Sequence, residues 1–127
     1  MGSVDCAIEF HNSVISGVAS EDGRVLVHFS KACVLAEKQG WLQEVELIVH
    51  DVRKLEEPGS YPLRVSEGEI CMEHAELPDL LEVPFARSGP CTVRILFDNA
   101  ESLAIHGKDP ELRLIGEREY IEEIEKP

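Results

Sequence analysis

The chain has 127 residues, of which 43% are hydrophobic, enough for one domain around a single core. It carries 25 Asp and Glu against 12 Lys and Arg, and the formal net charge of −13 disfavours nucleic-acid phosphates and anionic membrane surfaces as partners. No apolar run approaches the length of a membrane span, and the first residues lack the features of a signal peptide. We therefore expect a single domain over residues 1–127, located in the cytoplasm.

The first thirty residues are predicted to form β-strands. Apolar positions alternate over residues 7–10 and form a second run over 14–18. Asp22 and Gly23 then stand between two apolar runs, which is a strong hairpin signal because both residues tolerate positive φ. The hairpin predicts a further strand over residues 24–29.

The next segment contains one ambiguous stretch. Residues 25–27 are apolar at every position, which predicts a central strand covered on both faces. Residues 31–39 suit either a short helix capped by Ser30 or a continuation of the sheet. Gly40 ends either version, and a long strand is predicted over residues 44–52.

The middle of the chain is rich in turn formers. Residues 53–68 contain two prolines and two glycines and are predicted to form a loop, with at most a short edge strand over 63–65. A strand is predicted over 69–75. Residues 77–85 hold two further prolines and are predicted to form a covering loop whose leucines, Leu80 and Leu81, reach the core.

The clearest strand pattern runs from residue 89 to residue 117. Apolar and polar residues alternate there between turn formers, which is typical of half-buried antiparallel strands, and Thr92, Arg94 and Arg113 are predicted to face outward. The strand runs are 91–97, 103–105 and 112–114, and turns are predicted at 98–99 and 107–110. Residues 118–126 fit a last strand or a short helix.

Together these runs predict the fold class. About nine strand candidates, and no strong helix long enough to cover a sheet, favour an all-β domain. We expect an antiparallel β-sandwich or flattened barrel of about eight to ten short strands, with at most one or two short helices.

The cysteines predict free thiols. They are widely spaced and include no C-x-x-C pair, so neither a zinc ribbon nor a thioredoxin-like motif is supported. Their apolar neighbours are typical of buried thiols in a reducing compartment. The four residues are Cys6, Cys33, Cys71 and Cys91.

The histidines are the strongest hint of chemistry. Four of them lie inside or at the ends of predicted strands, so that strand ends meeting at one barrel mouth would gather imidazoles around zinc or non-haem iron. The simpler interpretation, which we favour, gives each histidine its own local hydrogen bond. These residues are His28, His50, His74 and His106.

Other candidate residues have structural explanations. Glu9, Glu46 and Glu73 are expected to mark the solvent face of the sheet, and Trp41 to anchor the core or its rim. No phosphate-binding loop or nucleophile elbow occurs. We therefore assign no catalytic, cofactor-binding or metal-binding residue and no cofactor.

The sequence favours a non-enzymatic cytoplasmic module that binds a protein partner or assembles with itself. The long strand over 44–52 is expected to pair with a second copy, which would give a homodimer. The first alternative is an acidic inhibitor or immunity-type protein that captures a basic partner, since the charge of −13 suits electrostatic capture. The second is a metal-dependent enzyme or sensor that uses the strand-end histidines.

Overall fold

The computed structural model describes residues 6–36, 39–72, 75–77, 80–83 and 85–123, with side chains described for 9–35, 40–72 and 86–115. Within these ranges the chain forms nine strands and no helix, which confirms the all-β prediction. The strands are β1 (Cys6–Glu21), β2 (Arg24–Ala36), β3 (Gln39–Glu56), β4 (Leu63–Met72), β5 (Ala75–Leu77), β6 (Leu80–Val83), β7 (Phe85–Ala86), β8 (Pro90–Phe97) and β9 (Ser102–Glu123).

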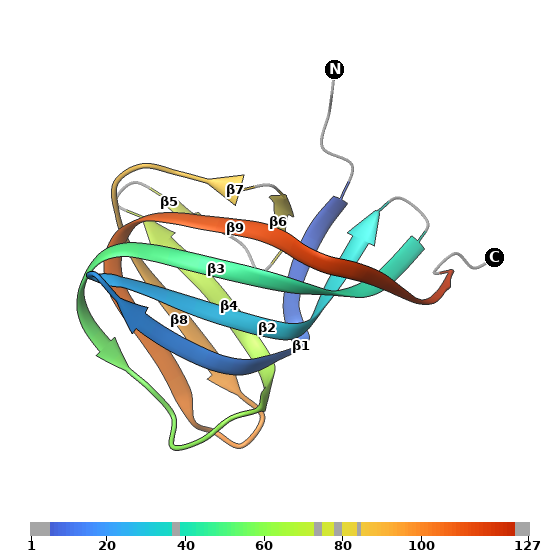
Figure 1. Ribbon diagram of the computed structural model, residues 1–127, viewed down its shortest axis with the longest axis horizontal. Coiled ribbons are helices and arrows are strands. Elements are labelled where there is room, and N and C mark those ends of the chain that lie inside the picture. Colours follow the sequence, from blue (N-terminus) through green and yellow to red (C-terminus); the bar gives the residue numbers. More distant parts are fainter. Residues whose placement is uncertain (1–5, 37–38, 73–74, 78–79, 84, 124–127) are drawn as a thin grey trace.

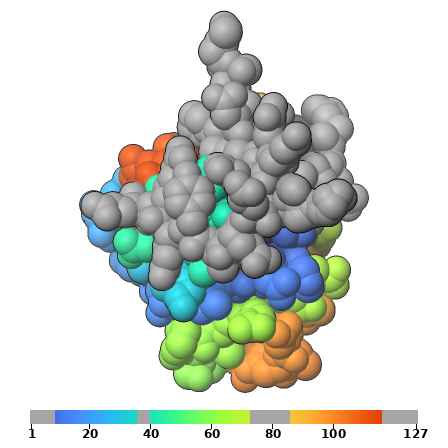
Figure 2. All heavy atoms as spheres, turned by 90° about the vertical axis from the view of Figure 1, so that its right-hand side faces the viewer, coloured from blue at the N-terminus to red at the C-terminus, as the bar shows by residue number. Residues whose placement is uncertain are grey.

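Six strands form a closed antiparallel barrel in the order β1-β2-β3-β9-β8-β4 (Figure 1). The ring closes where β1 meets β4, with Val14 opposite Arg64 and Ile15 opposite Leu63. Figure 2 shows this side of the molecule, where the blue atoms of β1 lie against the yellow-green segment around β4. Of the two expected architectures, a sandwich or a flattened barrel, the strands form a closed barrel, because β9 pairs with both β3 and β8 and joins the two sets of strands in one sheet.

The short strands extend this ring. β5 pairs with the end of β4, β6 with the start of β1, and β7 with the middle of β9. Of residues 77–85, expected to form a covering loop, residues 77, 80–83 and 85 are strand, and residues 78–79 and 84 lie outside the described part. The side chains of Leu80 and Leu81 lie outside the described part.

The core fills the inside of the barrel. Inward-facing residues alternate along each strand, and the rings of Phe10 and Phe29 stack with centroids 5.9 Å apart. Val25 and Val27 are buried, whereas Leu26 between them is half-buried on the outer face, so the prediction of a strand covered on both faces is wrong. Thr92, Arg94 and Arg113 lie outside the buried set, as predicted.

Trp41 is the largest buried side chain. It is 2% exposed, and its indole Nε1–H donates to Oε1 of Gln43 over 2.9 Å. Burying an indole requires a partner for its N–H, and the neighbouring amide supplies one. The prediction of a core anchor is confirmed.

Two stretches predicted as loop or turn are strand. β3 continues to Glu56 and β4 starts at Leu63, so the proline-rich connection is confined to residues 57–62. Residues 107–110, predicted as a turn, lie inside β9, where the register with β3 shifts around His50 and Lys108. Asp109 adopts a φ of 51° there.

Gly107 explains why the same residues form a bulge. A Cβ at this position would lie 2.6 Å from the carbonyl oxygen of His50, so only glycine allows the two backbones to approach this closely. A bulge needs the same small residues and residues tolerant of the αL conformation as a turn does. The sequence pattern therefore does not distinguish a bulge from a turn.

The two ambiguous segments are strand where the structure describes them. β2 runs to Ala36, β3 starts at Gln39, and β9 runs to Glu123. Residues 37–38 and 124–126 lie outside the described residues.

Candidate binding face on the barrel

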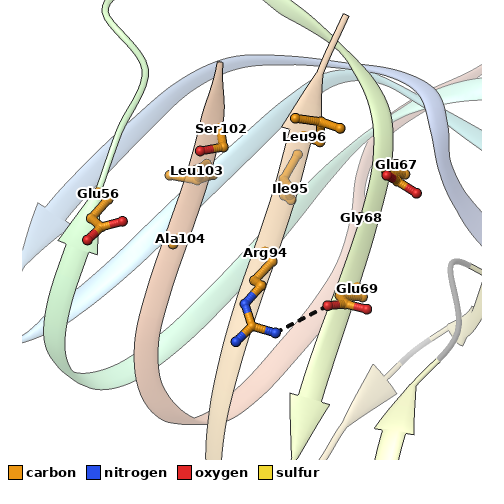
Figure 3. A pocket seen from close by; sticks show the side chains of 10 residues that line it. All are labelled: Glu56, Glu67, Gly68, Glu69, Arg94, Ile95, Leu96, Ser102, Leu103 and Ala104. Atoms are coloured by element: carbon orange, nitrogen blue, oxygen red, sulfur yellow. Dashed lines mark hydrogen bonds and ion pairs between the residues drawn. The ribbon is translucent and has the colours of Figure 1, made fainter. Parts of the chain in front are cut away.

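The outer face of β4, β8 and β9, with the end of β3, holds a hollow of about 470 Å³ (Figure 3). Two rows of side chains cross it from strand to strand. In one row Glu67, Leu96 and Ser102 are register neighbours. The second row crosses all four strands and contains Glu69, Arg94, Ala104 and Glu56.

Strand alternation places these side chains. Val93, Ile95 and Phe97 point into the core, so Arg94 and Leu96 between them must point outward. On β9 the outward positions carry only a hydroxymethyl and a methyl group, from Ser102 and Ala104. These small side chains leave the hollow between the longer ones on either side.

Leu96 is the apolar feature of this face. Among the described residues it is the exposed large hydrophobic side chain, with 39% of its surface accessible. Its neighbours across the strands are polar, so it forms an isolated apolar spot within a polar surround. A centre of this kind surrounded by polar groups resembles the anatomy of a protein interface.

The rim of the hollow is acidic. Three carboxylates, those of Glu56, Glu67 and Glu69, face one guanidinium, that of Arg94. Arg94 Nη1 lies 3.3 Å from Glu69 Oε2, and Lys54 Nζ lies 3.2 Å from Glu56 Oε2. Within the described part of the chain, Glu67 has no ion-pair partner. The face therefore holds negative charge that its own cations leave uncompensated.

The histidine cluster of the metal-site alternative does not form among the described residues. Nε2 of His50 lies 2.8 Å from Glu111 Oε2, and Nδ1 of His106 lies 3.3 Å from Thr92 Oγ1. His28 contacts Ser16 and Glu44 instead. Each of the three thus has its own local partners, as the simpler interpretation predicts.

Metal ligation finds no support in the described ranges. No three His, Cys, Asp or Glu side chains there are grouped closely enough to hold a metal ion. His74 and Glu73 lie outside the described residues. Glu46 lies on the outer face, as predicted, where its Oε1 is 3.4 Å from Arg113 Nη2.

Three cysteines are free in the described part of the chain. Cys91 is buried, whereas Cys33 and Cys71 are partly exposed, so the expectation of burial holds for one of them. Burial and the nearby carboxylate of Glu9 raise the pKa of the Cys33 thiol. Burial, followed by the charge of Asp109, raises the pKa of Cys91 to about 11. Both thiols are therefore protonated and weakly nucleophilic at neutral pH.

Two contributors to this surface are not predicted by the sequence pattern. Leu96 follows Ile95 and precedes Phe97, so it occupies an outward position within an apolar run. An apolar residue at a position where alternation predicts a polar one is the sequence signal for this exposed side chain. Glu67 gave no signal, because its position beside Leu96 depends on pairing between β4 and β8.

Comparisons of the chain with protein-family models, with curated proteins and with solved structures found no significant match. The described residues include no helix with the length and apolar character that crossing a membrane requires.

Proposed function

We propose that this chain is a non-enzymatic cytoplasmic module that binds a basic protein partner through the hollow on β4, β8 and β9. The observation that carries the proposal is Leu96, an exposed leucine in a hollow that three carboxylates line. The free thiols of the described cysteines are in keeping with a reducing compartment.

The chemistry of the hollow defines the partner segment. An extended strand or loop with one apolar side chain would cover Leu96, while a flanking Lys or Arg would pair with Glu67. The net charge of −13 would speed the encounter with such a segment. A dedicated basic toxin or nuclease, the partner of an immunity-type inhibitor, is one protein of this chemistry.

Self-assembly through the long strand is not supported. Over residues 45–48, β3 is paired with β2 on one side and with β9 on the other, so its backbone groups have no free edge there. A homodimer would have to use another surface.

Titration with a defined basic peptide tests the proposal. A short peptide of alternating leucine and lysine, added to ¹⁵N-labelled protein at low salt, is expected to shift the amide resonances of Glu67, Leu96 and Ser102 most strongly. The shifts should weaken with added salt, because the Debye length falls from about 10 Å at 0.1 M to about 3 Å at 1 M.

Matched variants separate this face from general acidity. Glu67→Gln and Leu96→Ser should each weaken binding by about 5-fold or more, equivalent to about 1 kcal/mol. Glu21→Gln removes one charge from the β1–β2 hairpin and should leave the affinity nearly unchanged. Equal losses in all three variants, or shifts spread over every acidic surface, would contradict a specific site.

A further inference from the structure

A serine, a histidine and a glutamate form one hydrogen-bonded chain on the outer face of β1, β2 and β3. Ser16 Oγ lies 2.7 Å from Nδ1 of His28, and Nε2 of the same ring lies 2.9 Å from Glu44 Oε2. This set lies on different strands from those that form most of the hollow around Leu96. Hydroxyl, imidazole and carboxylate in this order are the arrangement of an activated nucleophile.

A β-bulge places the serine. Ile15 is opposite Phe29 and Gly17 is opposite His28, so Ser16 is the extra residue between two register pairs. Bulges redirect side chains, and this one brings Ser16 Oγ to the imidazole. The hydroxyl also lies 3.4 Å from the backbone oxygen of His28, which is a weaker alternative acceptor.

The carboxylate determines which ring nitrogen carries the proton. An ionised Glu44 only accepts hydrogen bonds, so Nε2 of neutral His28 is the N–H donor and Nδ1 is the acceptor. The serine hydroxyl therefore donates to Nδ1, the nitrogen that would take its proton during attack.

Neighbouring charges leave this relay intact. Glu46 is directly opposite His28 in the register, but its carboxylate contacts Arg113 over 3.4 Å. Glu44 is thus the carboxylate that orients the imidazole.

The serine is also accessible. Ser16 itself is partly exposed, the His28 side chain is 39% exposed, and nothing lies within 4 Å of where a Cβ on Gly17 would be. We therefore expect a small molecule to approach the hydroxyl from the side of Gly17.

We infer that Ser16 is an activated nucleophile that accepts an acyl group from an activated ester, with His28 as the base. In this step the Ser16 Oγ–C bond forms and the bond from the acyl carbon to the leaving oxygen breaks. The serine proton passes to Nδ1 of His28 and then to the leaving group. Glu44 acts as a positioning residue through His28, and the product is a serine ester on the protein.

The test uses p-nitrophenyl acetate and peptide mapping by mass spectrometry, which distinguishes serine from cysteine adducts. We expect acetylation of Ser16 ahead of the other serines, and in Ser16→Ala the same peptide should be acetylated only at the slower rate of its remaining serines. His28→Gln should slow Ser16 acetylation by about 10²-fold, the usual contribution of a general base. Glu44→Ala should slow it less, and Glu44→Gln, which retains an acceptor for Nε2–H, should recover part of the rate.

Ser20→Ala is the matched control, since Ser20 is an exposed serine on the same strand and its loss should leave Ser16 acetylation unchanged. Circular dichroism verifies that each variant is folded. If His28→Gln does not fold, the comparison of Glu44→Ala with Glu44→Gln tests the inference instead. Acetylation of Ser20 at the same rate as Ser16, or a Ser16 rate that the His28 or Glu44 substitutions leave unchanged, would overturn the inference.

Discussion

Cys91 shows how one residue couples the core to pH. Its side chain lies inside the barrel with 6% of the residue exposed, close to the carboxylate of Asp109. Burial and that negative charge both disfavour the thiolate, while a backbone hydrogen bond from Gly107 offsets part of the effect. The folded protein therefore holds this proton more tightly than the unfolded chain does.

This asymmetry predicts alkaline destabilisation. The pKa of Cys91 rises from 9.0 to about 11, so its contribution to stability is complete below the unfolded value and is lost as pH climbs toward the folded value. Urea unfolding at a series of pH values measures the free energy of unfolding. This free energy should fall more steeply with rising pH in the wild type than in Cys91→Ala, because the alanine side chain cannot ionise. Parallel curves for the two proteins between about pH 9 and pH 11 would be incompatible with a raised pKa.

Among the elements, β8 depends on β9 for its starting point. The backbone N–H of Asp109 donates to the Gly89 carbonyl over 2.9 Å, and the N–H of Gly89 donates to Asp109 Oδ1 over 2.8 Å. Asp109 also takes up the left-handed conformation, with φ of 51°. One residue thus satisfies both backbone groups of Gly89 and forms the bulge.

Substitution of Asp109 should separate these two roles. Asp109→Ala removes the side-chain acceptor and places a residue that disfavours αL at the bulge, so we expect a loss of about 1–3 kcal/mol in the free energy of unfolding. Asp109→Asn keeps an acceptor oxygen and tolerates αL, so its loss should be less than half as large. Denaturant titration of both variants measures the difference, and equal losses would show that the carboxylate charge matters instead.

At the scale of the whole molecule, the barrel closes through a short seam between β1 and β4 in the part of the chain that the structure describes. β2 and β3 are paired along most of their lengths, whereas β1 and β4 are joined through Val14–Arg64 and Ile15–Leu63 in the described residues. A short seam has few cooperative hydrogen bonds, so local opening should begin there.

Native-state hydrogen exchange tests this expectation. Amide protons that cross the β1–β4 seam should exchange at least about 10-fold faster than those between β2 and β3, equivalent to about 1.4 kcal/mol of local opening energy. Amides of Val27 and Leu47 in the β2–β3 ladder serve as internal references. Equal protection across both regions would mean that the barrel opens as a single unit.

The sequence supports the local elements better than their assembly. The Asp22-Gly23 hairpin occurs as predicted, with positive φ at both residues, and the alternation of residues 91–97 places their side chains correctly. Both signals depend on neighbours in the chain. Closure of the barrel instead depends on pairs such as Ile15 with Leu63. These residues lie far apart in the sequence, and the periodicity of apolar residues within each strand does not show which strands pair.

The candidate sites were hidden for the same reason. The hollow around Leu96 needs three strands in register, and Ser16 reaches His28 only through a bulge that no pattern in residues 14–18 announces. The sequence marks the individual histidines as residues of interest but gives no sign of their partners.

The position of β9 between β3 and β8 has a consequence for the order of events during synthesis. β8 and β9 can form a hairpin as soon as both are made, whereas β3 must wait for a partner that leaves the ribosome about fifty residues or more later. Until then one flank of β3 exposes unpaired backbone groups, which is the condition under which strands associate with other chains. Because non-local pairing of this kind is slow, we expect the nascent protein to be most prone to association with other chains until β9 is complete.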